Sequence, residues 1–148
     1  MKLMKKGHAV HQIGYHIIFC TKYRQPILTN TVEMECKKII AECCIEYKWF
    51  LKTIEVMPDH VHIFIQADTS LAPYRIVQTI KSISAVHIFS TFPKIKGAKF
   101  WGSGLWSKSY YIGSVGNMSK SVVERYINNQ KSSSSMETSS HSIPEDQS

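Results

Sequence analysis

Four segments of the chain show the patterns of apolar and polar positions that predict β-strands, namely two-residue alternation and runs of β-branched and aromatic side chains. They span residues 10–20, 49–57, 57–66 and 105–112. The second and third segments meet at Met57-Pro58-Asp59-His60, which leaves room only for a tight turn, so we expect a hairpin there. In the third segment Val61, Ile63 and Ile65 form an apolar row, which predicts a sheet with one packed face.

Between these predicted strands, apolar residues recur at helical spacing, which predicts two helices. This spacing extends from residue 32 to about residue 47, and from about residue 71 to a Phe-Pro pair at residues 92–93, where the proline ends the helix. Residues 94–99 are expected to form a basic loop, and a last helix is expected to begin at Asn117 or Ser119 and end near Lys131. The order β-α-β-β-α-β followed by a helix is the ferredoxin-like pattern of the α+β class. It predicts an antiparallel sheet with helices on one face and the opposite face uncovered.

The composition changes abruptly after residue 131. Residues 132–148 contain eight serines and neither an aromatic residue nor a lysine or arginine. Such a segment cannot build a core, so we expect a domain in residues 1–131 and a disordered serine-rich tail in residues 132–148. The glycine-bearing segment 113–116 is expected to be a flexible joint before the last helix.

Charge indicates the kind of partner. The chain has a net charge of +7, and all 18 lysines and arginines lie in residues 1–131 together with eight of the 11 acidic residues, so that this part has a net charge of +10. A body this basic, with 11% aromatic residues, suits a polyanion such as nucleic acid. A soluble basic domain without such a partner has the same composition.

Other compartments are not favoured. No window approaches the ~18 apolar residues of a membrane span, and no apolar signal region follows the basic first residues, so we expect a cytoplasmic protein with no membrane partner. The four cysteines lack the spacing of a zinc ribbon or a disulfide framework and are expected to be reduced core or helix residues. They are Cys20, Cys36, Cys43 and Cys44.

The third strand contains candidate metal ligands. His60 and His62 are two residues apart and should project from the same face, which is the geometry of two neighbouring positions around one divalent metal ion. A His-x-His pair on a half-buried strand is also common as polar surface, so a third ligand is needed. His87, at the edge of a helical apolar stripe, is expected to be a core or rim histidine and not a ligand.

The last helix offers the third ligand. Tyr126 and Gln130 are four residues apart and therefore neighbours on one helical face. If that face packs on the histidine side of the sheet, Gln130 completes a His-His-Gln site for Mg²⁺ or Mn²⁺, and Tyr126 can attack a polarised phosphate to form a phosphotyrosine bond. Tyr110 and Tyr111 are rival nucleophiles, but they lie on a strand without a ligand-type residue one helical turn away. A core position on an amphipathic helix is the structural alternative for Tyr126.

Several basic residues are candidates for phosphate contacts. The exit of the first strand combines two cations with an aromatic side chain, and three lysines of the basic loop lie near three aromatics. Both groups could equally be solvated loops. The candidate DNA-binding residues are Lys22, Tyr23, Arg24, Lys94, Lys96, Lys99 and Lys108.

Taken together, these motifs resemble the single-tyrosine HUH transposases of small bacterial and archaeal insertion sequences, the IS200 and IS605 group. The resemblance covers about residues 8–131, and the individual His-x-His motif is far less specific than the joint set. The matching segments are 57–62, 21–24, 104–111, 126–130 and the glycine-bearing joint.

The resemblance implies a metal-dependent, single-strand DNA transposase that recognises hairpins near the ends of its element. Such enzymes form a 5′-phosphotyrosine link, release a 3′-OH and later rejoin strands. The family works as homodimers whose sheets join, and the last helix of one subunit can complete the active site of the other. The joint at residues 113–116 suits such an exchange.

Two other functions stay open at this point. A ferredoxin-like sheet with basic loops could hold single-stranded nucleic acid without cleaving it, as RRM domains do, although such a module has no use for His60, His62, Tyr126 and Gln130 together. A replication or conjugation nuclease of the wider HUH class, or a domesticated transposase relative, would use the same residues. The short length and the lack of a helicase domain weigh against a replication protein.

Overall fold

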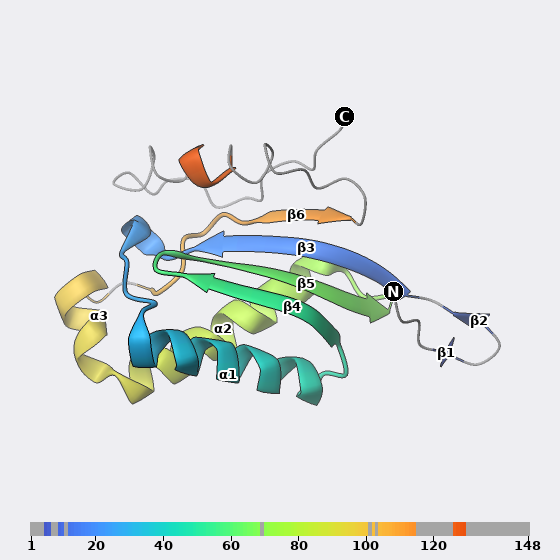
Figure 1. Cartoon of the computed structure of the whole chain (residues 1–148), viewed down its shortest axis with the longest axis horizontal. Coiled ribbons are helices and arrows are strands. Elements are labelled where there is room, and N and C mark those ends of the chain that lie inside the picture. Colours follow the sequence, from blue (N-terminus) through green and yellow to red (C-terminus); the bar gives the residue numbers. More distant parts are fainter. Residues whose placement is uncertain are drawn as a thin grey trace.

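The computed structural model describes residues 5–6, 9–10, 12–68, 70–100, 102, 104–114 and 126–129. Four antiparallel strands form the main sheet in the order β4-β5-β3-β6 (Figure 1). They are β3 (Gln12–Cys20), β4 (Phe50–Met57), β5 (His60–Asp68) and β6 (Tyr111–Ser114). Two short strands, β1 (Lys5–Lys6) and β2 (Ala9–Val10), pair separately. This order and the confirmed β4–β5 hairpin are those of the predicted ferredoxin-like fold.

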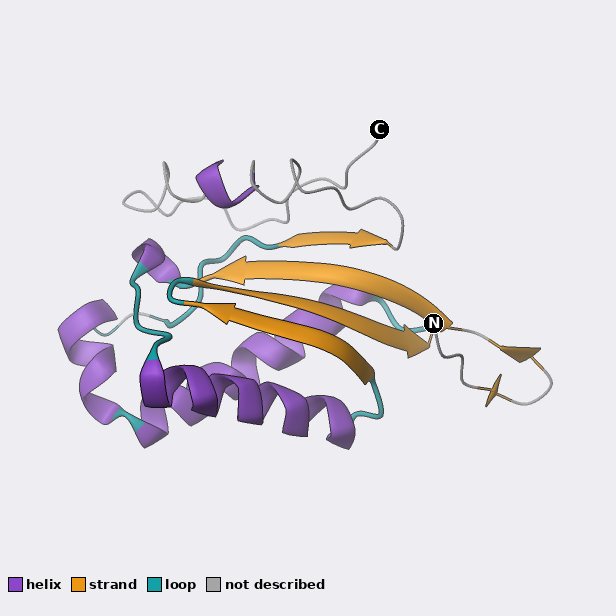
Figure 2. Cartoon of the chain, in the orientation of Figure 1, coloured by secondary structure: helices purple, strands orange, loops and turns teal. Residues whose placement is uncertain are grey.

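Two long helices cover one face of this sheet (Figure 2). They are α1 (Asn30–Glu46) and α2 (Pro73–Thr91), and α2 begins with proline at a position where the missing N–H is not needed. The predicted apolar row of β5 faces them, since Val61, Ile63 and Ile65 are fully buried in the main core together with Ile40 of α1 and Ile80 of α2. No helix among the described residues is long and apolar enough to cross a membrane.

The predicted basic loop at residues 94–99 is wrong, because these residues belong to a helix, α3 (Pro93–Phe100). Pro93 ends α2 but also has the φ angle that suits the first turn of the next helix. Phe100 anchors α3, since it is fully buried and packs edge-on against Phe89 with ring centroids 5.8 Å apart. A helix this short has too few apolar positions to show a period in the sequence.

The predicted strand at residues 105–112 is shorter in the structure and begins at Tyr111. Trp106 forms an isolated bridge with Thr21, flanked by backbone hydrogen bonds from Lys22 to the Leu105 carbonyl and from Ser107 to the Cys20 carbonyl, both 2.8 Å long. Side-chain hydrogen bonds also hold this segment. The indole of Trp106 donates to Ser84 Oγ at 2.9 Å, and Lys81 donates to the carbonyl of Ser107 at 2.6 Å. These hydrogen-bond partners belong to α2, far from residues 105–112 in the sequence. The local alternation of apolar and polar positions therefore could not reveal them.

The joint and the last helix are described in part. Gly113 is a residue of β6, and a Cβ atom there would lie 3.0 Å from the hydroxyl of Tyr111, so glycine leaves room for that ring. Residues 126–129 are helical, which agrees with the predicted helix. The remainder of that helix, the end of the joint and the serine-rich tail lie outside the described residues.

All four cysteines are buried thiols, Cys20 on β3 and the others on α1, as predicted. Burial raises the pKa of Cys36 and of Cys44 to about 12, and that of Cys43 to about 11. Thiols with such values are protonated at neutral pH and are poor nucleophiles.

Candidate active site

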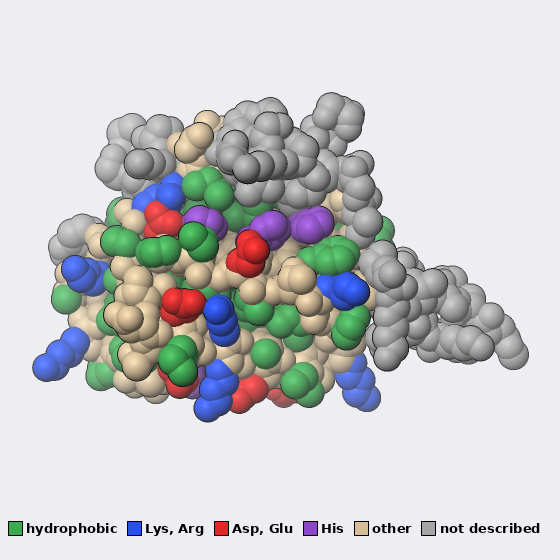
Figure 3. Space-filling view, in the orientation of Figure 1, with side chains coloured by type: hydrophobic (Ala, Val, Ile, Leu, Met, Phe, Trp, Pro, Cys, Tyr) green, Lys and Arg blue, Asp and Glu red, His purple; other side chains and the backbone are tan. Residues whose placement is uncertain are grey.

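The face of the sheet opposite α1 and α2 bears His60 and His62 and is called here the histidine face. Both imidazoles are partly exposed, with 16% and 26% of the side chain accessible, while Val61 between them is fully buried on the other face. Histidine side chains gather in one row on the molecular surface in Figure 3. The predicted two-residue alternation of β5 is therefore confirmed.

Asp59 orients His60. The Asp59 carboxylate Oδ1 lies 2.9 Å from His60 Nδ1, which leaves Nε2 as the ring nitrogen that can bind a ligand. Burial would raise the pKa of Asp59, but its hydrogen bonds with His60 and Arg24 hold that pKa below its ordinary value. The carboxylate is thus anionic at neutral pH and stabilises one ring orientation.

His16 on β3 is a site residue that the sequence analysis did not identify. Its Nδ1 lies 3.2 Å from His62 Nε2, and its ring stacks on Phe64 with centroids 4.6 Å apart. Burial lowers the pKa of His16, and burial followed by repulsion from His16 lowers that of His62. Both rings are therefore neutral at neutral pH, so that one donates and the other accepts. On the other side of His62, Glu55 Oε1 lies 3.8 Å from Nδ1.

The strand register explains why His16 was missed. The alternation of β3 places His16 on one side of that strand, but only pairing with β5 brings it opposite Phe64 and next to His62. Two antiparallel strands of this length can pair in several registers that the sequence alone does not distinguish.

Tyr126 lies on the histidine face. It is 2% exposed and packs in a second apolar cluster with Ile18, Cys20 and Tyr111, with Ile127 beside it. In the β3–β5 register Ile18 is opposite His62 and Cys20 is opposite His60, so both lie on the histidine face next to the candidate ligands. The chain therefore brings its tyrosine onto the same face of its own sheet as the two histidines.

The rival tyrosines occupy other positions. Tyr111 belongs to the second cluster, and its ring centroid lies 6.0 Å from that of Tyr126. Tyr110 packs against the main core instead, with Lys81 Nζ 5.7 Å from its ring centroid.

Arg24 connects the tyrosine segment to the histidine strand. Its Nη1 donates to the carbonyl of Ile127 at 2.7 Å, and its Nε and Nη2 lie 2.8 and 2.6 Å from Asp59 Oδ2. Asp59 is in turn hydrogen-bonded to His60. The guanidinium thus forms a bridge between the residue after Tyr126 and the turn that precedes β5.

The other predicted site residues are distributed over the molecule. Lys22 lies over the ring of Tyr23 at 5.7 Å from its centroid, at the exit of β3. Lys94, Lys96 and Lys99 are exposed on α3, and Lys108 is exposed in the segment before β6. Gln130 lies outside the described residues. Within the described part, no group of three or more His, Cys, Asp or Glu side chains is arranged to hold a metal ion.

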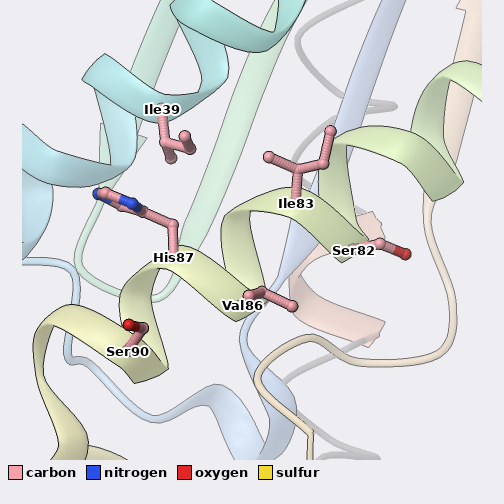
Figure 4. Close-up of a pocket in the computed structure, with 6 residues that line it drawn as sticks. All are labelled: Ile39, Ser82, Ile83, Val86, His87 and Ser90. Atoms are coloured by element: carbon pink, nitrogen blue, oxygen red, sulfur yellow. The ribbon is translucent and has the colours of Figure 1, made fainter.

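A separate cavity of about 490 Å³ lies on the helical layer (Figure 4). It is lined by Ile39 of α1 and by residues of α2 that include Ile83 and His87. His87 Nε2 lies 2.8 Å from Glu35 Oε1, so this residue is a rim histidine paired across two helices, as predicted. The sheet separates this cavity from the histidine face.

Sequence comparisons identify related proteins. Residues 9–130 match the family model described as "Transposase IS200 like". The ISDra2 transposase TnpA of Deinococcus radiodurans is 37% identical over 128 residues, which make up 86% of this chain and 91% of that protein. The transposase for insertion sequence element IS200 of Salmonella typhimurium is 22% identical over 124 residues, covering 84% of this chain and 80% of that protein.

Solved structures agree with this relationship. The crystal structure of a transposase from Deinococcus radiodurans has a TM-score of 0.78 and 35% identity, covering 86% of this chain and 98% of that chain. The REP-associated tyrosine transposase bound to a REP hairpin shares the fold, with a TM-score of 0.53 at 14% identity over 89% of this chain and 74% of that chain. The family model and the ISDra2 relative both span most of the sequence, and the chain therefore belongs to the IS200-like transposase family.

Proposed function

We propose that this transposase cleaves and rejoins single-stranded DNA at hairpin-bearing ends of an insertion sequence, with Tyr126 as the nucleophile. The observation that carries the proposal is the packing of Tyr126 on Ile18 and Cys20, directly beside His62 and His60 on the histidine face. A buried phenol, two imidazoles and the carboxylate of Asp59 thus lie in one region of the histidine face. Family membership supports transposition over a replication or conjugation nuclease.

His60 and His62 would hold a divalent cation, Mg²⁺ or Mn²⁺, with Gln130 as the third ligand. The residues fit such an ion, because Asp59 fixes the ring of His60 and burial lowers the pKa of His62, which keeps that imidazole neutral. To bind the cation through Nε2, His62 would exchange its contact with His16 Nδ1 for the metal. When bound, the cation would polarise a phosphate oxygen and offset its charge.

The chain's own residues would position the reacting groups. A tyrosine hydroxyl is a poor nucleophile in water, so Tyr126 needs accurate placement and a polarised phosphate to attack phosphorus. A new bond forms between the tyrosine oxygen and the 5′-phosphate, the phosphodiester bond to the 3′-oxygen breaks, the phenol loses its proton and the departing 3′-oxygen gains one. The phosphotyrosine retains the energy of the broken bond, so that a 3′-OH can later reverse the step.

The proposed substrate follows from charge and from a relative. Residues 1–131 have a net charge of +10, and the fold relative is a transposase bound to a REP hairpin. Phosphates would contact Lys22, the lysines of α3 and Lys108, with Tyr23 available for base stacking. We further propose that the protein works as a homodimer in which the last helix can serve either sheet.

Covalent capture of DNA tests this function. The purified protein is incubated with a single-stranded hairpin oligonucleotide from the end of its own element and a divalent cation, and protein–DNA adducts are resolved under denaturing conditions. Tyr126→Phe should abolish the adduct, whereas the matched control Tyr110→Phe, whose ring packs in the main core, should keep it. His62→Ala should lose cleavage and still bind the hairpin.

Two outcomes would reject the proposal. An adduct that persists in Tyr126→Phe would assign the nucleophile elsewhere. Hairpin binding without any adduct in the unmodified protein would support a binding module that does not cleave.

A further inference from the structure

We propose that Arg24 is a positioning residue that holds the Tyr126 segment in register with His60. The inference rests on the proposed function and adds a residue that the sequence analysis assigned to DNA contacts. The starting observation is a continuous path of hydrogen bonds from His60 through Asp59 and Arg24 to the backbone of Ile127.

The backbone around Arg24 favours this role. Tyr23 and Arg24 both have left-handed conformations, with φ angles of 60° and 52°. Residues other than glycine rarely adopt this region, and two in succession reverse the direction of the chain at the end of β3. Thr21 holds the start of the turn, since its backbone N–H donates to the carbonyl of Asp59 at 3.0 Å. The turn therefore presents the guanidinium to the Asp59 carboxylate at close range.

The chemistry of the contact requires arginine. Nε and Nη2 both lie within 2.8 Å of Asp59 Oδ2, while Nη1 donates to the Ile127 carbonyl at 2.7 Å. A planar guanidinium can direct donors to both partners at once, whereas a lysine ammonium is a point donor on a flexible stem. Only 13% of the Arg24 side chain is exposed, so a phosphate would compete with contacts that are already formed.

Asp59 couples the placement of the proposed nucleophile to that of a candidate metal ligand. Asp59 uses one carboxylate oxygen for His60 and the other for Arg24, so the same group orients a candidate metal ligand and anchors the tyrosine segment. The ring of Tyr126 supplies apolar contact with Ile18 and Cys20, but apolar contact has no directional preference. The hydrogen bond from Arg24 to the Ile127 carbonyl is directional, so it fixes the orientation of the Tyr126 segment, which apolar packing alone does not fix.

Three measurements on the same variants test the proposal. The variants are Arg24→Ala, Arg24→Lys and Asp59→Asn, with Arg75→Ala as a control because Arg75 is an exposed arginine on α2. The measurements are hairpin affinity with its salt dependence, the single-turnover rate of covalent attachment at saturating DNA, and amide hydrogen exchange of the peptide containing residues 126–129 in protein without DNA. Melting temperatures relative to Arg75→Ala identify any variant that fails to fold.

For Arg24→Ala we expect the attachment rate to fall about 10- to 100-fold, the effect of losing charge-assisted hydrogen bonds, with hairpin affinity and its salt slope unchanged. Exchange of residues 126–129 should become faster. Arg24→Lys should recover part of the rate, and combining Arg24→Ala with Asp59→Asn should cost no more than the worse single change, because both remove one path.

Opposite results overturn the proposal. A reduced affinity and a smaller salt slope at a preserved attachment rate would make Arg24 a phosphate contact. Unchanged rate and unchanged exchange would remove any role in positioning. If the unmodified protein forms no adduct, the proposed function fails, and the exchange of residues 126–129 still decides whether Arg24 holds this segment.

Discussion

Truncating Tyr126 separates its packing from its chemistry. Tyr126→Phe removes only the hydroxyl, whereas Tyr126→Ala also removes a ring that is 2% exposed and packs on Ile18, Cys20 and Tyr111. Neither variant can form a phosphotyrosine. We expect them to differ sharply in how firmly residues 126–129 stay on the histidine face.

The magnitude follows from burial. Removing a fully buried aromatic ring destabilises a packed site by about 3–5 kcal/mol, whereas Tyr126→Phe keeps the ring and its apolar contacts. At about 1.4 kcal/mol per tenfold change, Tyr126→Ala should raise the local opening equilibrium by roughly two to three and a half orders of magnitude, up to full opening, and Tyr126→Phe should change it far less. The main core lies on the other side of the sheet, so the melting temperature should change little in either variant.

Amide hydrogen exchange of the peptide containing residues 126–129, read by mass spectrometry in protein without DNA, measures this opening. Peptides from β5, whose apolar row lies in the main core, serve as the internal control. Equal exchange in Tyr126→Ala and Tyr126→Phe would mean that the ring does not hold the segment in place. The geometric basis of the proposed nucleophile would then be lost.

Four further outcomes are expected. If active sites are shared between subunits, heterodimers of Tyr126→Phe and His62→Ala chains should regain cleavage, because one of their two sites combines a wild-type tyrosine with wild-type histidines. Heterodimers that are shown to form but do not cleave would mean that each chain builds its own site. Hairpin binding should weaken steeply with salt in a gel-shift series, because the basic body displaces several counterions, and equal affinity for blunt duplex would contradict single-strand recognition. The hydrogen bond from His87 lowers the pKa of Glu35 below 4.5, so the contact stabilises the fold above pH 4.5 and this effect is lost as the pH falls through the lowered pKa. Glu35→Gln should therefore have a lower melting temperature than the unmodified protein at neutral pH, and the difference in melting temperature should disappear in acid. The buried thiols of α1 should resist alkylation in the native protein at pH near 8 and react fully in urea, which a thiol-counting assay measures.

The sequence by itself determined the repeating features of this protein. Side-chain direction in a strand has a period of two residues, so His60 and His62 had to share a face opposite the row of Val61, Ile63 and Ile65. The same local rules located the β4–β5 hairpin and the two long helices, and the joint set of motifs pointed to the family. These features depend on neighbours within a few residues, which a pattern can encode.

Only the tertiary structure decided which distant residues meet. His16 lies beside His62 because β3 and β5 pair in one particular register, and Arg24 binds Asp59 and Ile127 because two left-handed residues turn it back toward the sheet. In the same way, Phe100 anchors α3 in a buried position against Phe89, although the three lysines of residues 94–99 suggest a basic loop in the sequence. Each of these contacts joins segments far apart in the chain or depends on a burial site that other elements build. Contacts of either kind leave no periodic signal in the sequence.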